Sequence, residues 1–417
     1  MACDLDNSVV CVIGLGYVGL PLAEAFAKTI MVVGFDIDAN KVKNLSRACG
    51  SHNLYITDSP EEIRTADFII ICVPTPVTRS KEPDLGPVAS ASGIVAKNMK
   101  KGCTVILEST VYPGVTEEVV KPILEQSGLK CGSDFRIAYS PERINPGDEE
   151  HTLDKMTKVV GGVDKETTEL VAQLYGKVAA SVFKTRDIRT AEAAKVIENI
   201  QRDLNIALMN ELALIFEKMG LDTREVLEAA ATKWNFHRYS PGLVGGHCIP
   251  VDPYYLVYKA REVGYHSQVI LAGRAINDYM PRHVATLAIK ALNDVGKVIK
   301  NSKVLILGLA YKENVADIRE APVKEIIKEL QEYGIHLFGH DPLLNDAARE
   351  FGIEAIHELG SAKGIDCIIL AVTHNVFRGL TLDTLKQTMS ERPVLIDVRA
   401  FFDREQAKAA GFHYRRL

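Results

Sequence analysis

Short apolar runs alternate along the chain with longer stretches in which apolar residues recur every three or four positions. The first run, Val9–Ile13, is followed by a helical pattern over Leu20–Ala27 and by a second run, Met31–Phe35. Further strand-length runs lie at Phe68–Val73, Thr104–Leu107 and Arg136–Tyr139. Continuous apolar runs are typical of buried parallel strands, and their alternation with helices indicates a doubly wound sheet. The first third is therefore predicted to form a Rossmann-like domain.

The pattern changes after about residue 190. Gly and Pro disappear up to residue 219, and apolar side chains take helical spacing at Val196, Ile200, Leu204 and Ala207. This predicts one long helix that Gly220 closes, followed by helical segments over 223–231 and about 267–295. Because a long helix between two sheet domains often serves as a dimer surface, we expect a homodimer through it.

The last third repeats the order of the first. Strand-length runs at Lys303–Ala310, His336–Asp341, Cys367–Thr373 and Val394–Arg399 mirror those around the first sheet. The expected fold is α/β, with two Rossmann-like doubly wound parallel-sheet domains joined by a central helical segment. The expected boundaries are 1–187, 188–299 and 300–417.

The second copy is degenerate at its first turn. Gly308-Leu-Ala-Tyr-Lys312 lacks the later glycines, so it is expected to hold a dinucleotide poorly. Lys312 and Arg399 lie at or after strand ends, with Arg319 further along, and such cations suit the diphosphate of a nucleotide. The alternative is ordinary surface charge at loop tips.

Composition excludes several classes of partner. The 417 residues are 47% hydrophobic and 25% charged, with a net charge of −5, which favours neither nucleic acid nor an anionic membrane. The longest apolar runs have strand length, too short to cross a bilayer. The 8 cysteines show no metal-ligand spacing, so we expect no metal site and a reducing, cytoplasmic location.

A glycine-rich turn follows the first run. Gly14-Leu-Gly16-Tyr-Val-Gly19 lies between predicted strand and helix, and Asp36 ends the second strand. Gly14 allows the tight turn, Gly16 allows close approach of a pyrophosphate, and Gly19 allows helix and strand to pack. Asp36 suits a ribose hydroxyl and would repel a 2′-phosphate, which predicts NAD rather than NADP.

Chemistry is expected at three further places. Cys248 and Asp252 lie in a Gly- and Pro-rich loop, where a nucleophilic thiol and an ordinary half-buried thiol both fit. On the long helix, Lys195, Asn199 and Arg202 share one face, so Lys and Asn together can donate to an oxyanion, unless the face is simply solvated. Thr75, Thr110, Glu142 and Arg143 follow strand ends, where ligands bind in such sheets, so we expect them to contact a ligand. The alternative is that each is an ordinary turn or cap residue.

Five motifs complete the picture. They are Gly14–Gly19, Ser109-Thr-Val-Tyr-Pro-Gly114, Ala194-Lys-Val-Ile-Glu-Asn199, Gly245-Gly-His-Cys-Ile-Pro-Val-Asp252, and Gly308–Lys312 followed by Asp317-Ile-Arg319. Together they resemble the UDP-glucose/GDP-mannose dehydrogenase family over nearly the whole chain. The resemblance implies oxidation of C6 of a nucleotide sugar from alcohol to carboxylate with two NAD⁺.

The resemblance also implies roles for single residues. Cys248 would form a thiohemiacetal and then a thioester, Lys195 would act as acid and base and, with Asn199, stabilise oxygen anions, while Asp252 and Thr110 would hold the hydrolytic water. Glu142 matches a catalytic glutamate. The implied cofactor contacts are Gly14, Gly16, Tyr17, Val18, Gly19, Asp36, Lys41, Thr75, Thr110 and Arg319. The implied substrate contacts are Arg143, Ile144, Lys195, Asn199, Arg202, Arg238, Gly245, Tyr311, Lys312 and Arg399.

One segment points to a branch of the family. Glu142-Arg143-Ile144-Asn-Pro146-Gly and Glu198–Asn205 are similar to enzymes that act on UDP-GlcNAc or UDP-GalNAc, whose product suits polysaccharide biosynthesis. UDP-N-acetylmannosamine and UDP-glucose remain alternatives. A β-hydroxyacid dehydrogenase needs neither the cysteine nor a second Rossmann-like domain. A catalytically inert NAD-binding regulator would not need to keep Cys248, Lys195 and Asp252.

Overall fold

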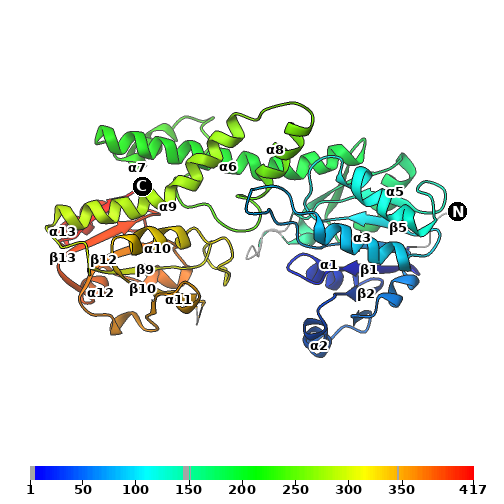
Figure 1. Ribbon diagram of the computed structural model, residues 1–417, viewed down its shortest axis with the longest axis horizontal. Helices are drawn as coiled ribbons and strands as arrows, with labels where there is room; N and C mark the ends of the chain where they lie inside the picture. Colours follow the sequence, from blue (N-terminus) through cyan, green and yellow to red (C-terminus); the bar gives the residue numbers. More distant parts are fainter. Residues whose placement is uncertain (1–4, 144–149, 151, 345–346) are drawn as a thin grey trace. The chain divides into compact units, whose positions relative to one another are not determined.

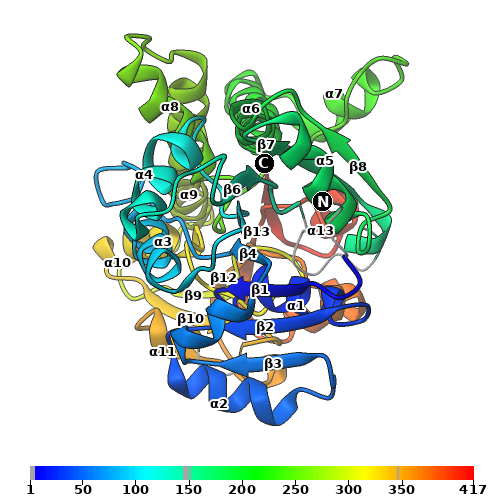
Figure 2. The same cartoon turned by 90° about the vertical axis from the view of Figure 1, so that its right-hand side faces the viewer.

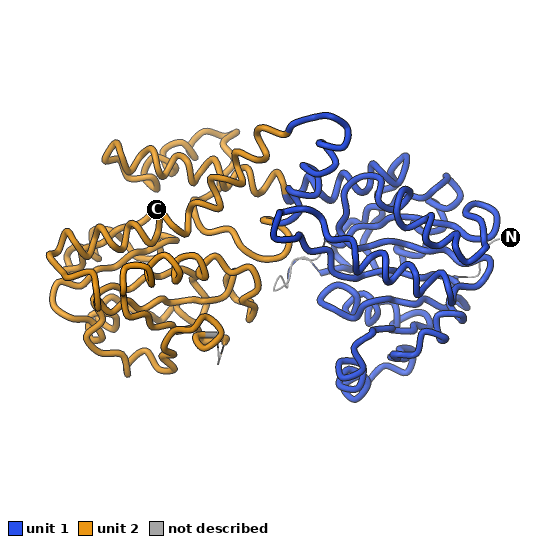
Figure 3. The backbone as a smooth tube through the Cα atoms, in the orientation of Figure 1, with its two compact units in different colours: residues 1–199, 251–266 blue, residues 200–250, 267–417 orange. Residues whose placement is uncertain are grey.

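The computed structural model describes residues 5–143, 150, 152–344 and 347–417. The chain divides into two compact units (Figure 3). The first unit comprises residues 1–199 and 251–266, and the second comprises residues 200–250 and 267–417. The predicted long helix is α6 (Ile188–Met219), and its residues are shared between the two units.

The first unit is built on one sheet of eight strands in the order β3-β2-β1-β4-β5-β6-β7-β8. Figure 2 shows β3, β2 and β1 side by side in this order. Neighbouring strands are parallel except β6 and β7. The order reverses between β1 and β4, which is where ligands bind in doubly wound sheets. The strands are β1 (Val9–Ile13), β2 (Met31–Phe35), β3 (Leu54–Thr57), β4 (Phe68–Ile71), β5 (Thr104–Leu107), β6 (Arg136–Tyr139), β7 (Thr157–Gly162) and β8 (Ser181–Lys184).

Helices cover both faces of this sheet, which explains why β1 is a continuous apolar run. Val10 and Val12 pack in the core that contains α1 and α5, whereas Cys11 and Ile13 pack in the core that contains α3. The helical elements of this unit are α1 (Gly19–Phe26), α2 (Ala39–Ala48), α3 (Gly86–Asn98), α4 (Lys121–Leu124), α5 (Lys165–Tyr175), α8 (Asp252–Glu262) and the short turns Pro60–Thr65, Thr116–Val120, Glu125–Ser127 and Leu153–Lys155.

The second unit contains a sheet of six parallel strands in the order β11-β10-β9-β12-β13-β14. The strands are β9 (Lys303–Leu307), β10 (His336–His340), β11 (Glu354–Ala355), β12 (Ile365–Leu370), β13 (Met389–Asp397) and β14 (His413–Arg416). The helical elements are α7 (Thr223–Ala230), α9 (Val269–Asp294), α10 (Val323–Glu332), α11 (Ala347–Glu350), α12 (Leu382–Lys386), α13 (Arg404–Ala409) and the short turns Leu359–Ser361 and Asn375–Gly379 (Figure 1). Helices α9 and α10 pack on one face of the sheet, and α12 and α13 on the other.

The predicted internal repeat is present in the backbone. Gly14 and Gly308 each follow the first strand of their sheet with positive φ angles of 90° and 82°. Their N–H groups donate to the carbonyls of Phe35 and His340, the last residues of β2 and β10. Within the described residues, no helix is long and apolar enough to cross a membrane.

Candidate active site

The turn after β1 has the shape that a dinucleotide requires. A Cβ atom on Gly14 would lie 2.7 Å from the carbonyl oxygen of Cys72, and one on Gly19 would collide with the carbonyl of Gly14. Nothing lies within 4 Å of a Cβ built on Gly16, which is exposed just before α1. The backbone of Gly16 is thus open to a ligand at the N-terminal end of a helix, where a pyrophosphate is favoured. Tyr17 is exposed, and Val18 is the N-cap residue of α1.

Asp36 lies beside this turn at the end of β2. Its carboxylate accepts from the N–H of Leu15 at 2.8 Å and from Lys41 Nζ at 2.7 Å. Burial alone would raise the pKa of Asp36, but the bonds from Lys41 and from the N–H groups of Leu15 and Asp38 lower it overall. An ionised acceptor next to an open Gly16 fits the ribose of NAD, so the residues present fit this cofactor.

The side chains predicted at strand ends follow different strands of the first sheet. Thr75 follows β4 and Thr110 follows β5, both half-buried. Arg143 is tied down more firmly, because its guanidinium donates to the Thr157 carbonyl at 2.7 Å and pairs with Glu198 at 2.9 Å. Ile144, which was predicted to contact substrate, lies outside the described residues.

Helices α6 and α8 bring three of the predicted catalytic residues together in the first unit. Lys195, Asn199 and Asp252 are 8%, 5% and 2% exposed. Asn199 Nδ2 donates to Asp252 Oδ2 at 2.5 Å. Burial raises the pKa of Asp252 to about 6, although the charge of Lys195 and the bond from Asn199 oppose the rise. Asp252 is therefore mostly a carboxylate at neutral pH that can still accept a proton.

A buried ion pair lies behind Glu142, and its members were absent from the predicted site. Lys158 is fully buried and donates to Glu108 and, at 2.8 Å, to the carbonyl of Pro141. Its Nζ is 3.7 Å from Glu142 Oε2, and Tyr175 Oη donates to Glu108 at 2.5 Å. Burial raises the pKa of Glu108 to about 7 against the opposing charge of Lys158. The Lys158 ammonium thus lies close to the carboxylates of both Glu108 and Glu142.

Glu192 was also missed by the sequence reasoning. It lies on α6 three residues before Lys195, is fully buried, and accepts from the N–H of Gly114 at 2.5 Å and from the N–H and hydroxyl of Thr116 at 2.9 and 2.7 Å. This carboxylate therefore connects α6 to the loop that begins at Ser109 and carries Thr110. A signal was available, since Glu192 shares the helical face of Lys195 and Asn199.

In the second unit, the loop that carries Cys248 rests on the turn after β9. Gly246 has a φ angle of 90°, and a Cβ there would lie 2.6 Å from the ring of Tyr311. The N–H of Gly246 donates to the Glu320 carbonyl at 3.3 Å, and His247 bonds to Asp317 at 3.1 Å. Among the described cysteines, Cys248 is the exposed one. The loop thus presents a thiol at the surface of its own unit while both residues before it are held.

The second unit contains five of the predicted cations, which are Arg202, Arg238, Lys312, Arg319 and Arg399. Arg319 forms a two-pronged bond with Asp317, and together with a contribution from His247 this lowers the pKa of Asp317 to about 2 although burial would raise it. Arg399 pairs with Glu313 at 3.1 Å, next to the half-buried Lys312. Arg202 is exposed on α6.

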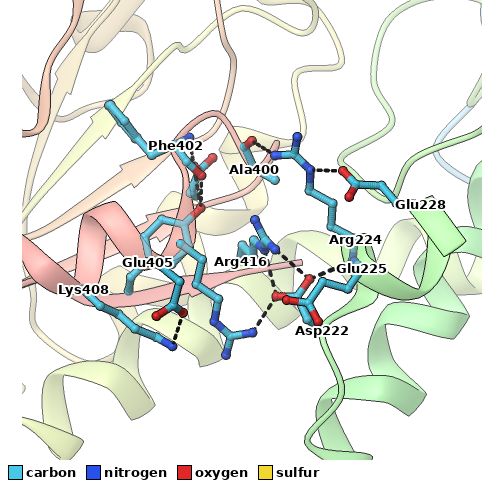
Figure 4. A network of polar contacts seen from close by, with 12 residues as sticks. Asp222, Arg224, Glu225, Glu228, Ala400, Phe402, Glu405, Lys408 and Arg416 are labelled. Atoms are coloured by element: carbon cyan, nitrogen blue, oxygen red, sulfur yellow. Dashed lines mark hydrogen bonds and ion pairs between the residues drawn. The ribbon is translucent and has the colours of Figure 1, made fainter.

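Arg238 and Arg399 line one cavity of about 330 Å³. Its walls are α7, the segment 236–241 and the segment 398–400, together with Leu417. Figure 4 shows how α7 is held against the end of the chain: Asp222 caps α7 and accepts from Arg416, and Arg224 donates to the Ala400 carbonyl. Arg404 of α13 also donates to Asp222. Two arginines and the aromatic rings of Phe236 and Tyr239 suit a planar, anionic ligand.

Family models match along most of the chain. The NAD-binding domain of the UDP-glucose/GDP-mannose dehydrogenase family matches residues 8–51 and 45–179, the central domain matches 189–279, and the UDP-binding domain matches 305–404. The chain belongs to the UDP-glucose/GDP-mannose dehydrogenase family. It is an NAD-dependent nucleotide-sugar 6-dehydrogenase.

Several known proteins are similar to this chain over 90% or more of their own length. UDP-N-acetyl-D-glucosamine 6-dehydrogenase of Pseudomonas aeruginosa is 45% identical, with 95% of this chain and 98% of that protein covered. Protein CapL of Staphylococcus aureus is 49% identical over 88% of this chain and 90% of its own length. The solved structure of UDP-D-ManNAc dehydrogenase from Pyrococcus horikoshii has a TM-score of 0.89 and 31% identity, with 98% and 99% of the two chains covered.

The dehydrogenase thus divides its predicted site residues between the two units. Lys195, Asn199 and Asp252 meet within the first unit, whereas Cys248, Gly245, Tyr311 and the cations belong to the second. In the second Rossmann-like sheet, Asp341 occupies the position that corresponds to Asp36. It accepts from the N–H groups of Leu309 and Ala310 and from the buried His374, so these contacts occupy its carboxylate.

Proposed function

We propose that this enzyme oxidises C6 of a UDP-N-acetylhexosamine, UDP-GlcNAc or UDP-GalNAc, to the carboxylate. Its relatives support this sugar: the UDP-N-acetyl-D-glucosamine 6-dehydrogenases of Pseudomonas aeruginosa and Salmonella typhi are 45% and 42% identical to the chain. The UDP-N-acetyl-D-mannosamine dehydrogenase of Methanococcus maripaludis is 32% identical. A UDP-linked uronic acid is a suitable precursor for polysaccharide synthesis. We also propose 1–187, 188–299 and 300–417 as the functional domains.

Two features support a four-electron oxidation. The first is the group of buried side chains formed by Lys195, Asn199 and Asp252. The second is the exposed thiol of Cys248, on a loop whose backbone is held by hydrogen bonds. NAD⁺, when bound, accepts one hydride from C6 in each oxidation. Lys195, acting as the neutral amine, takes the proton of the C6 hydroxyl and becomes an ammonium as the aldehyde forms. The Cys248 thiolate then adds to the aldehyde carbon, and Lys195 and Asn199 donate to the oxyanion, which gives a thiohemiacetal.

Loss of the second hydride and the hydroxyl proton converts the thiohemiacetal into a thioester. Water then attacks this thioester, the C–S bond breaks, and Cys248 leaves as a thiolate. Asp252, with a pKa raised to about 6 by burial, accepts the proton of that water, which Thr110 also holds. Glu142, whose carboxylate lies 3.7 Å from the Lys158 ammonium, is our candidate for a further catalytic acid or base beside Asp252.

Arg143 is the residue we propose to recognise the sugar. Its guanidinium is held by Glu198 and by the Thr157 carbonyl, so its remaining N–H groups have a fixed orientation in which they can donate to a ligand. It would bond the acetamido carbonyl or a sugar hydroxyl. Faster turnover of UDP-glucose than of UDP-GlcNAc and UDP-GalNAc would contradict this assignment, and a preference for UDP-ManNAc would favour the mannosamine branch.

The cavity between α7 and the segment 398–400 is our candidate for the nucleotide. Arg238 and Arg399 would contact the diphosphate, while Phe236 and Tyr239 would flank the base. Arg399→Ala should raise KM for the UDP-sugar while the Kd of NAD stays unchanged. Equal weakening of both ligands would show that the residue supports the fold instead.

We further propose a homodimer through α6. In the second unit, Leu208, Ile215 and Met219 recur at i, i+7 and i+11, and they are 50%, 44% and 62% exposed. Burial of such an apolar stripe between two copies would remove it from water. Light scattering of the wild type and of Leu208→Asp tests this: a monomeric wild type would contradict it, and a tetramer would extend it.

The reaction type is tested by counting NADH released per sugar over a panel of UDP-sugars. Two NADH per sugar are expected, with the highest kcat/KM for a UDP-N-acetylhexosamine. Cys248→Ser should keep NAD binding and stop net acid production. Normal uronate formation by this variant would exclude the covalent mechanism.

A further inference from the structure

The loop that carries Cys248 begins at a glycine with no side chain to anchor it. A Cβ on Gly242 would lie 2.7 Å from Nη1 of Arg399, so a side chain here would require the end of the Arg399 side chain to shift. Asn210, on α6, holds that backbone from both sides: its Nδ2 donates to the Gly242 carbonyl at 3.0 Å, and its Oδ1 accepts from the Gly242 N–H at 2.8 Å. We propose that Asn210 is a positioning residue that sets the Cys248 loop for attack on the sugar aldehyde.

A chain of buried polar groups stands behind Asn210. Asn210 Nδ2 also donates to Asn277 Oδ1 at 2.8 Å, and Asn277 Nδ2 donates to the carboxylate and carbonyl of Asp203 at 2.8 and 3.0 Å. Asp203 is paired with Arg274. These four side chains, on α6 and α9 of the second unit, are each at most 2% exposed.

This chain determines which way each amide points. An Asp203 carboxylate paired with a guanidinium is an acceptor, so the NH₂ group of Asn277 must face it. The oxygen of Asn277 then faces Asn210 and requires the NH₂ group of Asn210 there. Consequently, the oxygen of Asn210 is left for the Gly242 N–H. One ion pair therefore fixes the polarity of the clamp, and a reversed amide would leave donors facing donors.

The loop has a second anchor closer to the thiol. Gly245 and Gly246 pack against Tyr311, and the Gly246 N–H donates to the carbonyl of Glu320. Gly242 and Gly246 are therefore both fixed, and Cys248 follows two residues later. Because a misplacement of about 1 Å can cost on the order of a hundredfold in rate, release of the Asn210 anchor is expected to slow the steps that use Cys248.

The inference rests on the proposed role of Cys248 and predicts a specific kinetic signature. In Asn210→Asp the shape is kept, but the donor to Gly242 and Asn277 is lost. With enzyme and NAD⁺ in excess over UDP-GlcNAc, the wild type should release two NADH per sugar. The variant should release the first at a near-normal rate and the second about ten- to a hundredfold more slowly, with aldehyde trapped by hydroxylamine.

Two further measurements separate positioning from general damage. Asn205→Asp makes the same change on the same helix, where the amide donates to the Gln201 carbonyl, and it should leave both phases unchanged. If Asn210→Asp does not fold, Asn210→Ala, which adds no charge, takes its place. It should show the same selective slowing of the second NADH release. The rate at which iodoacetamide alkylates Cys248 should also differ between this variant and the wild type.

Wild-type kinetics in a folded Asn210 variant would overturn the inference. Equal slowing of both phases together with a lower Tm would overturn it as well, because that result reflects destabilisation alone. A wild type that releases one NADH per sugar would instead refute the proposed function, so the two failures are distinguishable.

Discussion

Removal of the buried ammonium of Lys158 is expected to destabilise the first unit in a pH-dependent way. In Lys158→Met the aliphatic stem is largely kept, so little cavity forms and the change is mainly electrostatic. The variant leaves Glu108 buried without its cation, and Glu142 loses a positive charge 3.7 Å away. Loss of one partner of a buried ion pair costs about 3–5 kcal/mol.

The sign of the pH dependence follows from Glu108. Burial already raises the pKa of Glu108 to about 7 in the presence of Lys158, and removal of the cation raises it further. A carboxyl whose pKa is raised on folding stabilises the protein while it is protonated, and that contribution is lost as pH rises through the folded pKa. The loss in Lys158→Met should therefore be small near pH 5 and approach its full size above pH 8.

Differential scanning calorimetry at pH 5.5 and pH 8 measures this difference. For a domain of 150–250 residues, 3–5 kcal/mol corresponds to a fall in Tm of roughly 6–20 °C at the higher pH. Lys101→Met is the matched control, because Lys101 pairs with Asp134 at 2.9 Å but is 72% exposed, so its Tm should be nearly unchanged. A loss below about 1 kcal/mol at pH 8, or an equal loss at both pH values, would refute the reasoning.

Three other expectations concern the reaction. Asp252→Asn should lower kcat by about a hundredfold or more and abolish the rise of kcat through pH 6 that the raised pKa of Asp252 predicts; a variant with the wild-type pH profile would exclude Asp252 as the base. Gly246→Ala should reduce kcat at least tenfold, because a Cβ on a residue with a φ angle of 90° would lie 2.6 Å from the Tyr311 ring and would move the Cys248 loop. The backbone strain of such a residue costs roughly 1–3 kcal/mol. Gly360→Ala, whose Cβ has nothing within 4 Å, should leave kcat unchanged. Asp36→Ser should weaken NAD binding and reduce the preference of the enzyme for NAD over NADP, with the Kd of each cofactor measured by fluorescence titration. An unchanged ratio of the two Kd values would show that Asp36 does not contact the ribose.

Local patterns were sufficient for the architecture and for the conformation of the glycine-rich turn after β1. Mostly apolar runs predicted β1, β2, β4, β5 and β6, because a parallel strand covered on both faces buries most of its side chains. The glycines at 14 and 19 were readable because only glycine tolerates the contacts found there. The second Rossmann-like sheet was predicted from the repeated order of its strands.

The groups that surround the predicted catalytic residues were not readable in this way. Glu108 and Lys158 are 50 residues apart, and Glu192 reaches back 78 residues to Gly114. A charged residue in a strand reads as solvent-exposed, since nothing local shows that the opposite charge is buried beside it. The same holds for Asn210, whose partner Gly242 is 32 residues away.

The sequence by itself thus determined the two Rossmann-like sheets, the helical segment and the family, because these depend on periodicity and on residue types within short motifs; the reactive side chains that it predicts stay predictions. Only the tertiary structure decided that Asn199 bonds to Asp252, that Lys158 lies between two carboxylates, and that Asn210 clamps the Cys248 loop. The physical reason is that pKa values and loop positions depend on desolvation and on partners distant in the chain, and packing alone brings those partners together.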